Sequence, residues 1–260
     1  MPLITLTTDF GLGSPYVAVL KGVIYAINAD AQIVDLTHAI PPQDIRSGAL
    51  ALEQATPWFP TGTLHLAVVD PGVGGRRGIV YAEIGGGRYV APDNGLLNRL
   101  AAREKPARIV AVEEPRFWLP RVSATFHGRD IMAPVVARLS LGLPPERLGP
   151  ALDQLVSLTW PEVLILPRSI RGSVESIDSF GNLITDINET MLADVPRDES
   201  VRIACDEHET LGIFRTYSEQ PPATLMALIG SSGRLELAIV EENAAAMLGI
   251  RAGMAVTVSW

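Results

Sequence analysis

Residues 70–77, with the sequence DPGVGGRR, constrain the fold of this chain more than any other segment. They follow the apolar run at residues 64–69, whose length and composition predict a buried strand. A carboxylate therefore stands where a strand ends, followed by a glycine-rich turn and an arginine. Ligands of open α/β sheets bind at the carboxyl ends of strands, and glycines let the backbone approach them closely. A tight turn with a surface ion pair would produce the same local pattern.

Apolar residues in the first part of the chain are spaced as in alternating strands and helices. The expected strands are residues 3–7, 33–36, 64–69, 78–84 and 109–112, and the expected helices are residues 17–27, 45–52 and 128–141. Pro134 lies inside the last helix and predicts a kink. The alternating order predicts an α/β N-terminal domain over residues 1–160, with a largely parallel sheet flanked by helices.

The pattern becomes rich in short strands near residue 160. The expected strands are residues 174–177, 183–187, 201–204, 211–215, 224–229, 235–240 and 255–258, with one short helix at residues 242–248. Turn residues separate these segments. They predict a smaller all-β domain over residues 168–260, either a sandwich or a barrel.

Composition argues against several classes of function. A net charge of −8 does not suit nucleic-acid binding, which needs a basic surface. Cys205 is the single cysteine, so neither a disulfide framework nor a thiolate zinc site can form within one chain. No apolar run reaches the length of a membrane helix, and the first residues lack the basic region of a signal peptide. We therefore expect a cytoplasmic protein that binds neither nucleic acid nor membrane.

Polar residues at the ends of the early strands are candidates for a site. Asp9 follows the first strand, where a carboxylate can bind two ribose hydroxyls or cap the helix near Ser14. His38 follows the second strand and is interpreted as a structural residue. Asp93 lies in the sequence PDNG and suits a turn.

A divalent-metal site is the competing interpretation of these residues. The oxygen and nitrogen ligands available for it are Asp9, Asp70, Asp93, His127 and Asp130. Their spacing does not match a paired zinc motif on a helix, and Asp130 can instead pair with Arg129. We therefore expect no metal.

Two polar turns of the second part are further candidates. Between two expected strands, Asp178 could hold an ammonium group and Asn182 could read a base edge, although a hairpin turn explains both residues equally well. The turn at residues 230–233 contains Ser231 and Ser232, whose hydroxyls and backbone N–H groups could bind a carboxylate.

Seven segments together carry a family resemblance. They are TTDFG at 7–11, DLTHAIPPQD at 35–44, VVDPGVGGRR at 68–77, APDNGLL at 91–97, FHGRDIMAP at 126–134, DSFGNLITDI at 178–187 and GSSGRLELA at 230–238. In this order the chain resembles the S-adenosyl-L-methionine (SAM) hydroxide adenosyltransferases, also called SAM hydrolases, which are related to fluorinases and chlorinases. The resemblance implies an α/β N-terminal domain, a barrel-like C-terminal domain, and a homotrimer whose substrate sites lie between subunits.

The resemblance also implies a reaction and its residues. SAM and water would give adenosine and L-methionine by attack of activated water on the ribose C5′, without a cofactor. The catalytic set would be Asp70, Arg77 and His127, with His127 a candidate to take the proton of water. Substrate would be bound through the following residues: the ribose by Asp9, the ammonium by Asp178, adenine by Asn182 and by stacking on Tyr217, and the carboxylate by Ser231 and Ser232.

Two alternatives stay open. A SAM-dependent halogenase of this family would carry a tyrosine in place of Asp70, a serine in place of Gly128 and an additional loop. The chain also departs from the hydrolase pattern at Gly75, where Thr or Ser is common, and at Asp186, where Asn is common and a carboxylate would add charge near the base. The second alternative is a regulator that binds adenosine or SAM without catalysis.

Overall fold

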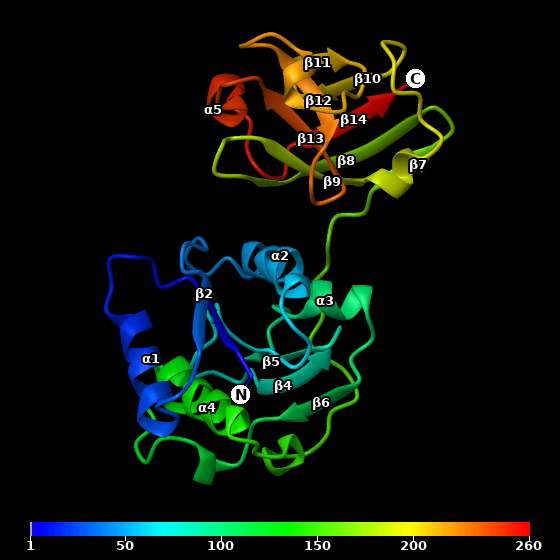
Figure 1. Cartoon of the computed structure of the whole chain (residues 1–260). Helices are drawn as coiled ribbons and strands as arrows, with labels where there is room; N and C mark the ends of the chain where they lie inside the picture. Colours follow the sequence, from blue (N-terminus) through cyan, green and yellow to red (C-terminus); the bar gives the residue numbers. More distant parts are fainter. Residues whose placement is uncertain (1) are drawn as a thin grey trace. The chain divides into compact units, whose positions relative to one another are not determined.

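The computed structural model describes residues 2–260. They form two compact units, of which the first ends at Leu158 and the second begins at Thr159 (Figure 1). Each unit encloses a hydrophobic core of its own. No helix within residues 2–260 has the length and apolar character required to cross a lipid bilayer.

The first unit is built on a six-stranded sheet with the order β2-β1-β3-β5-β4-β6. The strands are β1 (Ile4–Thr8), β2 (Ile33–Thr37), β3 (Leu64–Val68), β4 (Ile79–Ile84), β5 (Gly87–Pro92) and β6 (Arg108–Ala111). β1 is parallel to β2 and β3, β3 is parallel to β5, and β4 is antiparallel to β5 and β6. The prediction of a largely parallel sheet is confirmed.

Helices cover both faces of this sheet (Figure 1). α1 (Tyr16–Ile27) and α4 (Ala133–Ser140) pack on one face, and α2 (Ile45–Ala55) and α3 (Asn98–Arg103) pack on the other. Leu66 of β3 belongs to the first core and Ala67 to the second, as the two-residue period of a strand requires. Burial on both faces explains why β3 is a continuous apolar run.

The helix expected over residues 128–141 consists of two elements. A π-helical turn, Gly128–Met132, leads into α4, and Pro134 is the second residue of α4. The backbone is helical without a break over residues 127–140, so Pro134 lies inside one longer helical run, directly after the π-helical turn. Prolines and π-helical turns are both places where the regular hydrogen bonding of a helix is interrupted.

The second unit is an antiparallel sheet with the order β11-β10-β14-β8-β9-β13-β12. Its strands are β7 (Leu164–Leu166), which pairs with β8, then β8 (Ser169–Ile177), β9 (Leu183–Asn188), β10 (Arg202–Cys205), β11 (His208–Leu211), β12 (Leu225–Ile229), β13 (Arg234–Ile239) and β14 (Ala255–Ser259). The helix α5 (Ala244–Leu248) packs beside the sheet.

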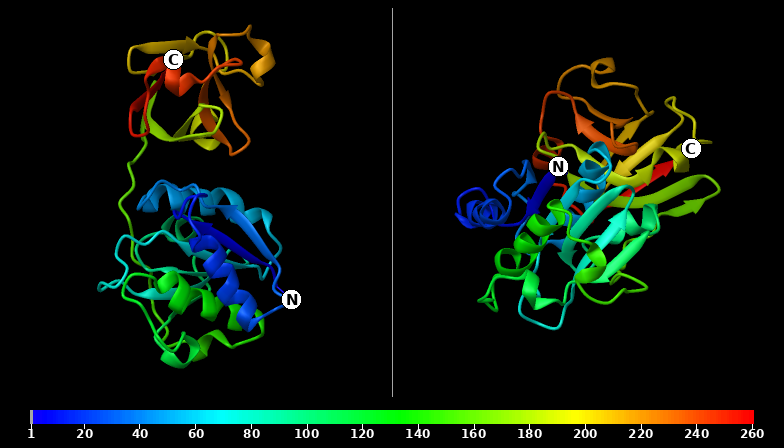
Figure 2. Two further views of the ribbon diagram at one scale, coloured as in Figure 1. Left: turned by 90° about the vertical axis from the view of Figure 1, so that its left-hand side faces the viewer. Right: turned by 60° about the horizontal axis from the view of Figure 1, so that its bottom comes forward.

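β11 and the segment that follows it come within hydrogen-bond distance of β12, the strand at the other end of the sheet order; Figure 2 shows the ribbon of this unit from two further sides. The Thr210 hydroxyl donates to the Leu225 carbonyl at 3.0 Å, and the Phe214 N–H donates to the Ala227 carbonyl at 2.8 Å. Closure leaves few unpaired strand edges, which would otherwise expose backbone groups. The all-β prediction is confirmed, and the sheet is barrel-like.

Some elements were missed or misplaced by the sequence analysis. β5, β7 and α3 were not expected, and the strand expected over residues 211–215 is β11 instead. Gly212 has φ +78° and ends β11 at Leu211, so the chain turns where a continuous strand was predicted.

Candidate functional site

Asp9 and Asp70 lie at the same edge of the first sheet. β1 and β3 are parallel neighbours with Thr8 opposite Val68. Asp9 follows β1 directly, and Asp70 follows β3 after one residue. The pairing therefore brings two carboxylates that lie 61 positions apart in the sequence to the carboxyl ends of adjacent strands. Ligands of such sheets bind at these ends.

Asp70 and Arg77 form a buried, two-pronged ion pair. Arg77 Nε donates to both carboxylate oxygens of Asp70, at 2.9 and 3.0 Å, and Arg77 Nη2 donates to Oδ2 at 2.5 Å. The side chain of Asp70 is only 5% exposed, and that of Arg77 is only 11% exposed. A buried pair of this geometry holds both groups in one orientation, which excludes the surface ion pair considered from the sequence.

The turn that joins Asp70 to Arg77 packs tightly on the segment before His127. Gly74 has φ +77°, and a Cβ atom there would lie 2.2 Å from the carbonyl oxygen of Ala124. Only glycine combines this conformation with so close an approach. Gly75 has no such requirement, and a Cβ there would lie 3.0 Å from the Gly72 carbonyl oxygen.

His127 completes the cluster through the same arginine. Arg77 Nη2 lies 2.9 Å from His127 Nδ1. Because a guanidinium only donates, Nδ1 must accept, so the neutral ring carries its hydrogen on Nε2. Burial and the charge of Arg77 lower the pKa of His127, while Asp70 and Asp130 oppose this shift. The geometry thus favours a neutral imidazole that offers an Nε2–H donor rather than a vacant basic nitrogen.

Asp9 is held by a strained loop residue. Its Oδ2 accepts a hydrogen bond from the backbone N–H of Gln43 at 2.8 Å, and Gln43 has φ +68°. Left-handed backbone in a residue other than glycine is costly and concentrates at functional sites. The alternative role of Asp9 as a helix cap is wrong, because α1 begins at Tyr16 after Pro15 with no side-chain cap.

Three aromatic rings connect the Asp9 turn to the His127 segment. Phe10 contacts Tyr16 and Phe126 edge to face, each with ring centroids 5.7 Å apart, and Tyr16 contacts Phe126 at 5.3 Å. Phe10 adjoins Asp9 and Phe126 adjoins His127. These contacts place the two polar residues on neighbouring segments.

His38 has the structural surroundings that the sequence suggested. Its Nδ1 lies 2.9 Å from the Thr8 hydroxyl, and its Nε2 lies 3.1 Å from Asp35 Oδ1. The His38 carbonyl accepts from the Gly11 N–H at 2.8 Å. The two hydrogen bonds, at Nδ1 and at the carbonyl, join His38 to the turn that carries Asp9.

The other carboxylates of the competing metal hypothesis have protein partners. Asp93 Oδ1 accepts from the Val156 N–H at 2.8 Å. Asp130 accepts from Arg129 Nε at 2.6 Å and from the Ser123 N–H at 2.8 Å. Within residues 2–260, no group of three or more His, Cys, Asp or Glu side chains is arranged to hold a metal ion.

In the second unit, Asp178, Asn182 and Tyr217 meet, together with a residue that was not predicted. Asp178 Oδ1 accepts from the backbone N–H groups of Phe180 and Asn182, and Asp178 Oδ2 accepts from Asn182 Nδ2 at 3.0 Å. Asn182 Nδ2 also lies 3.5 Å from the Tyr217 hydroxyl, which donates to Glu236 Oε2 at 3.0 Å. Burial and the bond to Glu236 raise the pKa of Tyr217 to about 12.

Ser231 and Ser232 are exposed in the loop between β12 and β13. Asp186, by contrast, is engaged within the sheet, where its two oxygens accept from the Ser173 N–H and hydroxyl, both at 2.7 Å. This carboxylate therefore joins β8 to β9.

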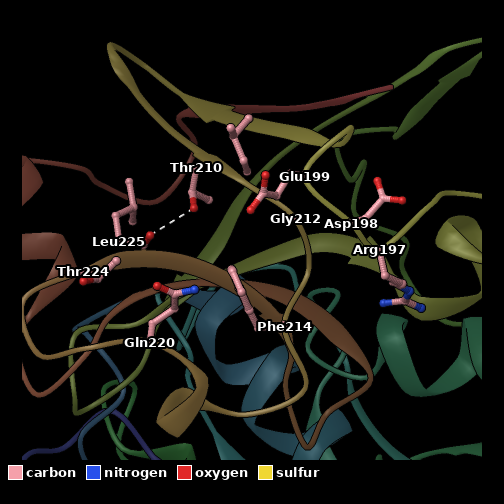
Figure 3. A pocket seen from close by; sticks show the side chains of 10 residues that line it. Arg197, Asp198, Glu199, Thr210, Gly212, Phe214, Gln220, Thr224 and Leu225 are labelled. Carbon is pink, nitrogen blue, oxygen red and sulfur yellow. Dashed lines mark hydrogen bonds between the residues drawn. The ribbon is translucent and has the colours of Figure 1, made fainter.

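A separate cavity of about 350 Å³ lies between β11 and β12 (Figure 3). Its lining includes the side chains of Thr210, Phe214, Gln220 and Leu225, which Figure 3 draws as sticks. None of the site residues predicted from the sequence is among its lining residues. The cavity marks the closure of the barrel-like sheet and is distinct from the Asp178 cluster.

Family models cover both units of the chain. Residues 4–149 match the SAM hydroxide adenosyltransferase N-terminal domain, and residues 172–257 match the C-terminal domain. The chain belongs to the SAM hydroxide adenosyltransferase family. This membership confirms the resemblance found in the sequence.

Individual members of the SAM hydroxide adenosyltransferase family and its relatives align over nearly the whole chain. The (R)-S-adenosyl-L-methionine hydrolase of Thermus thermophilus is 40% identical over 257 residues, which cover 96% of each chain. The crystal structure of an uncharacterized conserved protein from Thermotoga maritima has a TM-score of 0.94 at 34% identity, covering 99% of this chain and 100% of that one. The fluorinase of Nocardia brasiliensis is 28% identical over 290 residues, covering 99% of this chain and 96% of its own.

Glu236 is the residue of this SAM hydroxide adenosyltransferase that sequence analysis missed. It is 6% exposed on β13, between the buried residues Leu235 and Leu237. A carboxylate inside an apolar strand was a visible signal, because buried acids need a specific partner. The hydroxyl of Tyr217 is that partner.

Replacing Gly74 by alanine should destabilise the first unit more than the same change at Gly62. Both glycines have positive φ, at +77° and +84°, but only Gly74 faces a backbone oxygen, while Gly62 faces open space. We expect Gly62→Ala to cost about 1–2 kcal/mol and Gly74→Ala about 3 kcal/mol or more. Urea denaturation of both variants measures the difference, and equal losses would contradict the tight packing of this turn.

Proposed function

We propose that this protein hydrolyses SAM to adenosine and L-methionine by attack of activated water on the ribose C5′. The observation that carries the proposal is the buried chain of Asp70, Arg77 and His127 at the carboxyl edge of the sheet. Membership in the SAM hydroxide adenosyltransferase family supports it, as does the likeness to a named SAM hydrolase over 96% of the chain. SAM is the substrate, and the reaction needs no cofactor.

The chemistry requires little beyond a well-placed nucleophile. The sulfonium leaves as a neutral thioether, so no general acid is needed, and the water must be held in line with the C5′–S bond. In the proposed mechanism Arg77 stabilises hydroxide character on the attacking oxygen. Asp70 orients Arg77, and His127 donates from Nε2 to the attacking oxygen. As the C5′–O bond forms and the C5′–S bond breaks, the proton that the water loses passes to a solvent water, and the electron pair of the C5′–S bond stays on the methionine sulfur. The donor role of His127 replaces the proton-accepting role considered from the sequence, because Arg77 occupies Nδ1.

The remaining predicted residues are proposed to bind substrate. Asp9 binds the ribose hydroxyls, Asp178 the methionine ammonium and Asn182 the adenine. Ser231 and Ser232 bind the methionine carboxylate, and their exposure leaves their hydroxyls open to a ligand. Tyr217, which is 40% exposed, offers a ring for stacking on adenine.

We further propose a cytoplasmic homotrimer in which residues 1–160 of one subunit and residues 168–260 of a neighbour together bind one substrate. One observation supports a shared site. The catalytic candidates belong to one compact unit and the amino-acid-binding candidates belong to the other.

The halogenase alternative is disfavoured at two positions. Asp70, whose carboxylate is paired with Arg77, stands where the halogenases carry a tyrosine. The serine of halogenases would also be crowded at Gly128, where a Cβ atom would lie 3.1 Å from Val68 Cγ1. Water is therefore the nucleophile in our proposal.

Incubation with SAM should release adenosine and methionine in equal amounts, and EDTA should not slow the reaction. In ¹⁸O-labelled water the label should enter the 5′-hydroxyl of adenosine. Loss of activity with EDTA and its recovery with a divalent metal would instead support a metal hydrolase. A 5′-halogenated product at high halide would support a halogenase, and stoichiometric binding without release over time would support a regulator.

The acid limb of the pH profile should report His127. Because burial and Arg77 lower its pKa below 6.5, the neutral ring persists through neutral pH and is lost only as pH falls below that value. Protonation of His127 would place a second cation against Arg77. We therefore expect kcat/KM to decline as pH falls below 6.5 and to stay level above it. His127→Ala should reduce kcat roughly 10²- to 10³-fold, as for loss of one oriented donor, and should remove the acid limb. An unchanged limb in this variant would contradict the assignment.

Mixed assemblies test the shared site. Subunits with His127→Ala and subunits with Asp178→Ala should each be impaired, and their co-assembly should recover activity where intact residues from two different subunits meet. Subunit exchange is verified with tagged chains. A mixture that exchanges fully and stays as inactive as its parents would show that each chain holds a complete site.

A further inference from the structure

Asp9 lies in a turn that His38 contacts both before and after the carboxylate. Before Asp9, the Thr8 hydroxyl lies 2.9 Å from His38 Nδ1. After Asp9, the Gly11 N–H donates to the His38 carbonyl at 2.8 Å. One residue beyond the end of β2 therefore holds this turn through its side chain and through its backbone.

The Thr8 hydroxyl determines the shape of the turn. Its Oγ1 accepts the backbone N–H of Phe10 at 3.2 Å, which closes the turn across Asp9. Thr8 has no exposed surface, and a buried hydroxyl needs a hydrogen-bond partner. His38 Nδ1 is that partner, so the orientation in which Thr8 serves Phe10 depends on the imidazole.

Charged groups on the other side of the His38 ring keep it in place. Its Nε2 has no well-aligned hydrogen bond but lies 3.1 Å from Asp35 Oδ1, and a carboxylate at this distance attracts the ring N–H. Lys21 of α1 pairs with Asp35 Oδ2 at 2.6 Å. Because only 6% of the His38 side chain is exposed, the ring has little freedom to turn away from Thr8.

The loop that follows His38 binds the Asp9 carboxylate itself. The Gln43 N–H donates to Asp9 Oδ2 at 2.8 Å, and the next residue, Asp44, is the N-cap of α2. The loop is therefore anchored by His38 at one end and by the helix at the other. Within residues 2–260, Asp9 Oδ1 accepts no hydrogen bond, which leaves this oxygen for a ligand.

We propose that His38 is a positioning residue of the ribose subsite, which acts through Thr8 to keep the Asp9 carboxylate where it accepts the two ribose hydroxyls. The proposal rests on the proposed function, in which Asp9 binds these hydroxyls. A turn released from His38 would let the carboxylate shift, and hydrogen bonds weaken steeply as their distance and angle depart from the optimum. Preference for a ribose with both hydroxyls thus depends on a residue that is not proposed to touch the ligand.

Titration calorimetry with adenosine and with 2′,3′-dideoxyadenosine, which lacks both hydroxyls, tests this without requiring turnover. The intact protein should bind adenosine more tightly. His38→Phe keeps a planar ring but removes both nitrogens, so that Thr8 loses its partner. We expect the affinity for adenosine to fall about tenfold, the magnitude of one hydrogen bond, while the affinity for dideoxyadenosine stays the same.

Two further variants identify the bond to Thr8 as the cause. Thr8→Val removes the hydroxyl and keeps the branched shape of the side chain, so it should lower the preference for adenosine equally. Adding His38→Phe to it should lower the preference no further, because both changes remove one shared interaction. His38→Asn offers an amide oxygen close to the former position of Nδ1 and should restore most of the preference.

His65 provides the matched control. It is buried on β3, and its Nδ1 lies 2.8 Å from the hydroxyl of Thr5 on β1. Thr5 and His65 are paired near the ends of these strands that lie away from Asp9. His65→Phe removes the same kind of bond from the same sheet, so it should leave the preference for adenosine unchanged even where it lowers stability.

An unchanged preference in His38→Phe, an equal loss of affinity for both nucleosides, or the same loss of preference in His65→Phe would each overturn the proposal. Equal binding of the two nucleosides by the intact protein would also overturn it, because no ribose subsite would then exist. A protein that prefers adenosine, loses the preference in His38→Phe and Thr8→Val, and fails to hydrolyse SAM would support the role of His38 while refuting the proposed reaction.

Discussion

The buried ion pair between Asp70 and Arg77 is the interaction on which the first unit's site depends. Neither charge can be removed from water without its partner, and deleting one partner of such a pair typically costs about 3–5 kcal/mol. The pair therefore determines where the guanidinium lies, and the remaining donor of Arg77 reaches His127 from 50 positions away in the chain. Because arginine keeps its protons at all ordinary pH values, the direction of that hydrogen bond is also determined.

The second unit also contains a buried group with one hydrogen-bonding role, but there the group accepts. Arg77 is a group that only donates, and the Glu236 carboxylate only accepts. Each stands beside a group that can do both: His127 in one unit and Tyr217 in the other. A buried group with a single hydrogen-bonding role thus decides the role of its adaptable neighbour.

Sequence patterns located most elements that position these groups. β3 was evident as an apolar run, and β1 was expected over residues 3–7. The polar residues after both strands were recognised because strand ends are where a sheet presents side chains to ligands. β5 was missed because a glycine turn precedes it and Pro92 ends it, which leaves little strand pattern between them. Asp93 and Asp130 looked equivalent to Asp70 in the sequence, yet the backbone N–H of Val156 occupies the first, and Arg129 and Ser123 occupy the second.

The sequence by itself determined which residue types stand at the strand ends and turns, because burial periodicity, glycine and proline act over a few neighbouring residues. Only the tertiary structure decided which of these residues meet and which atom donates to which. The contacts of Arg77 with His127 and of Tyr217 with Glu236 join segments 50 and 19 positions apart, and no local pattern encodes the direction of such a bond. That direction follows from burial, since a polar atom removed from water must take whichever partner the packed fold places within reach.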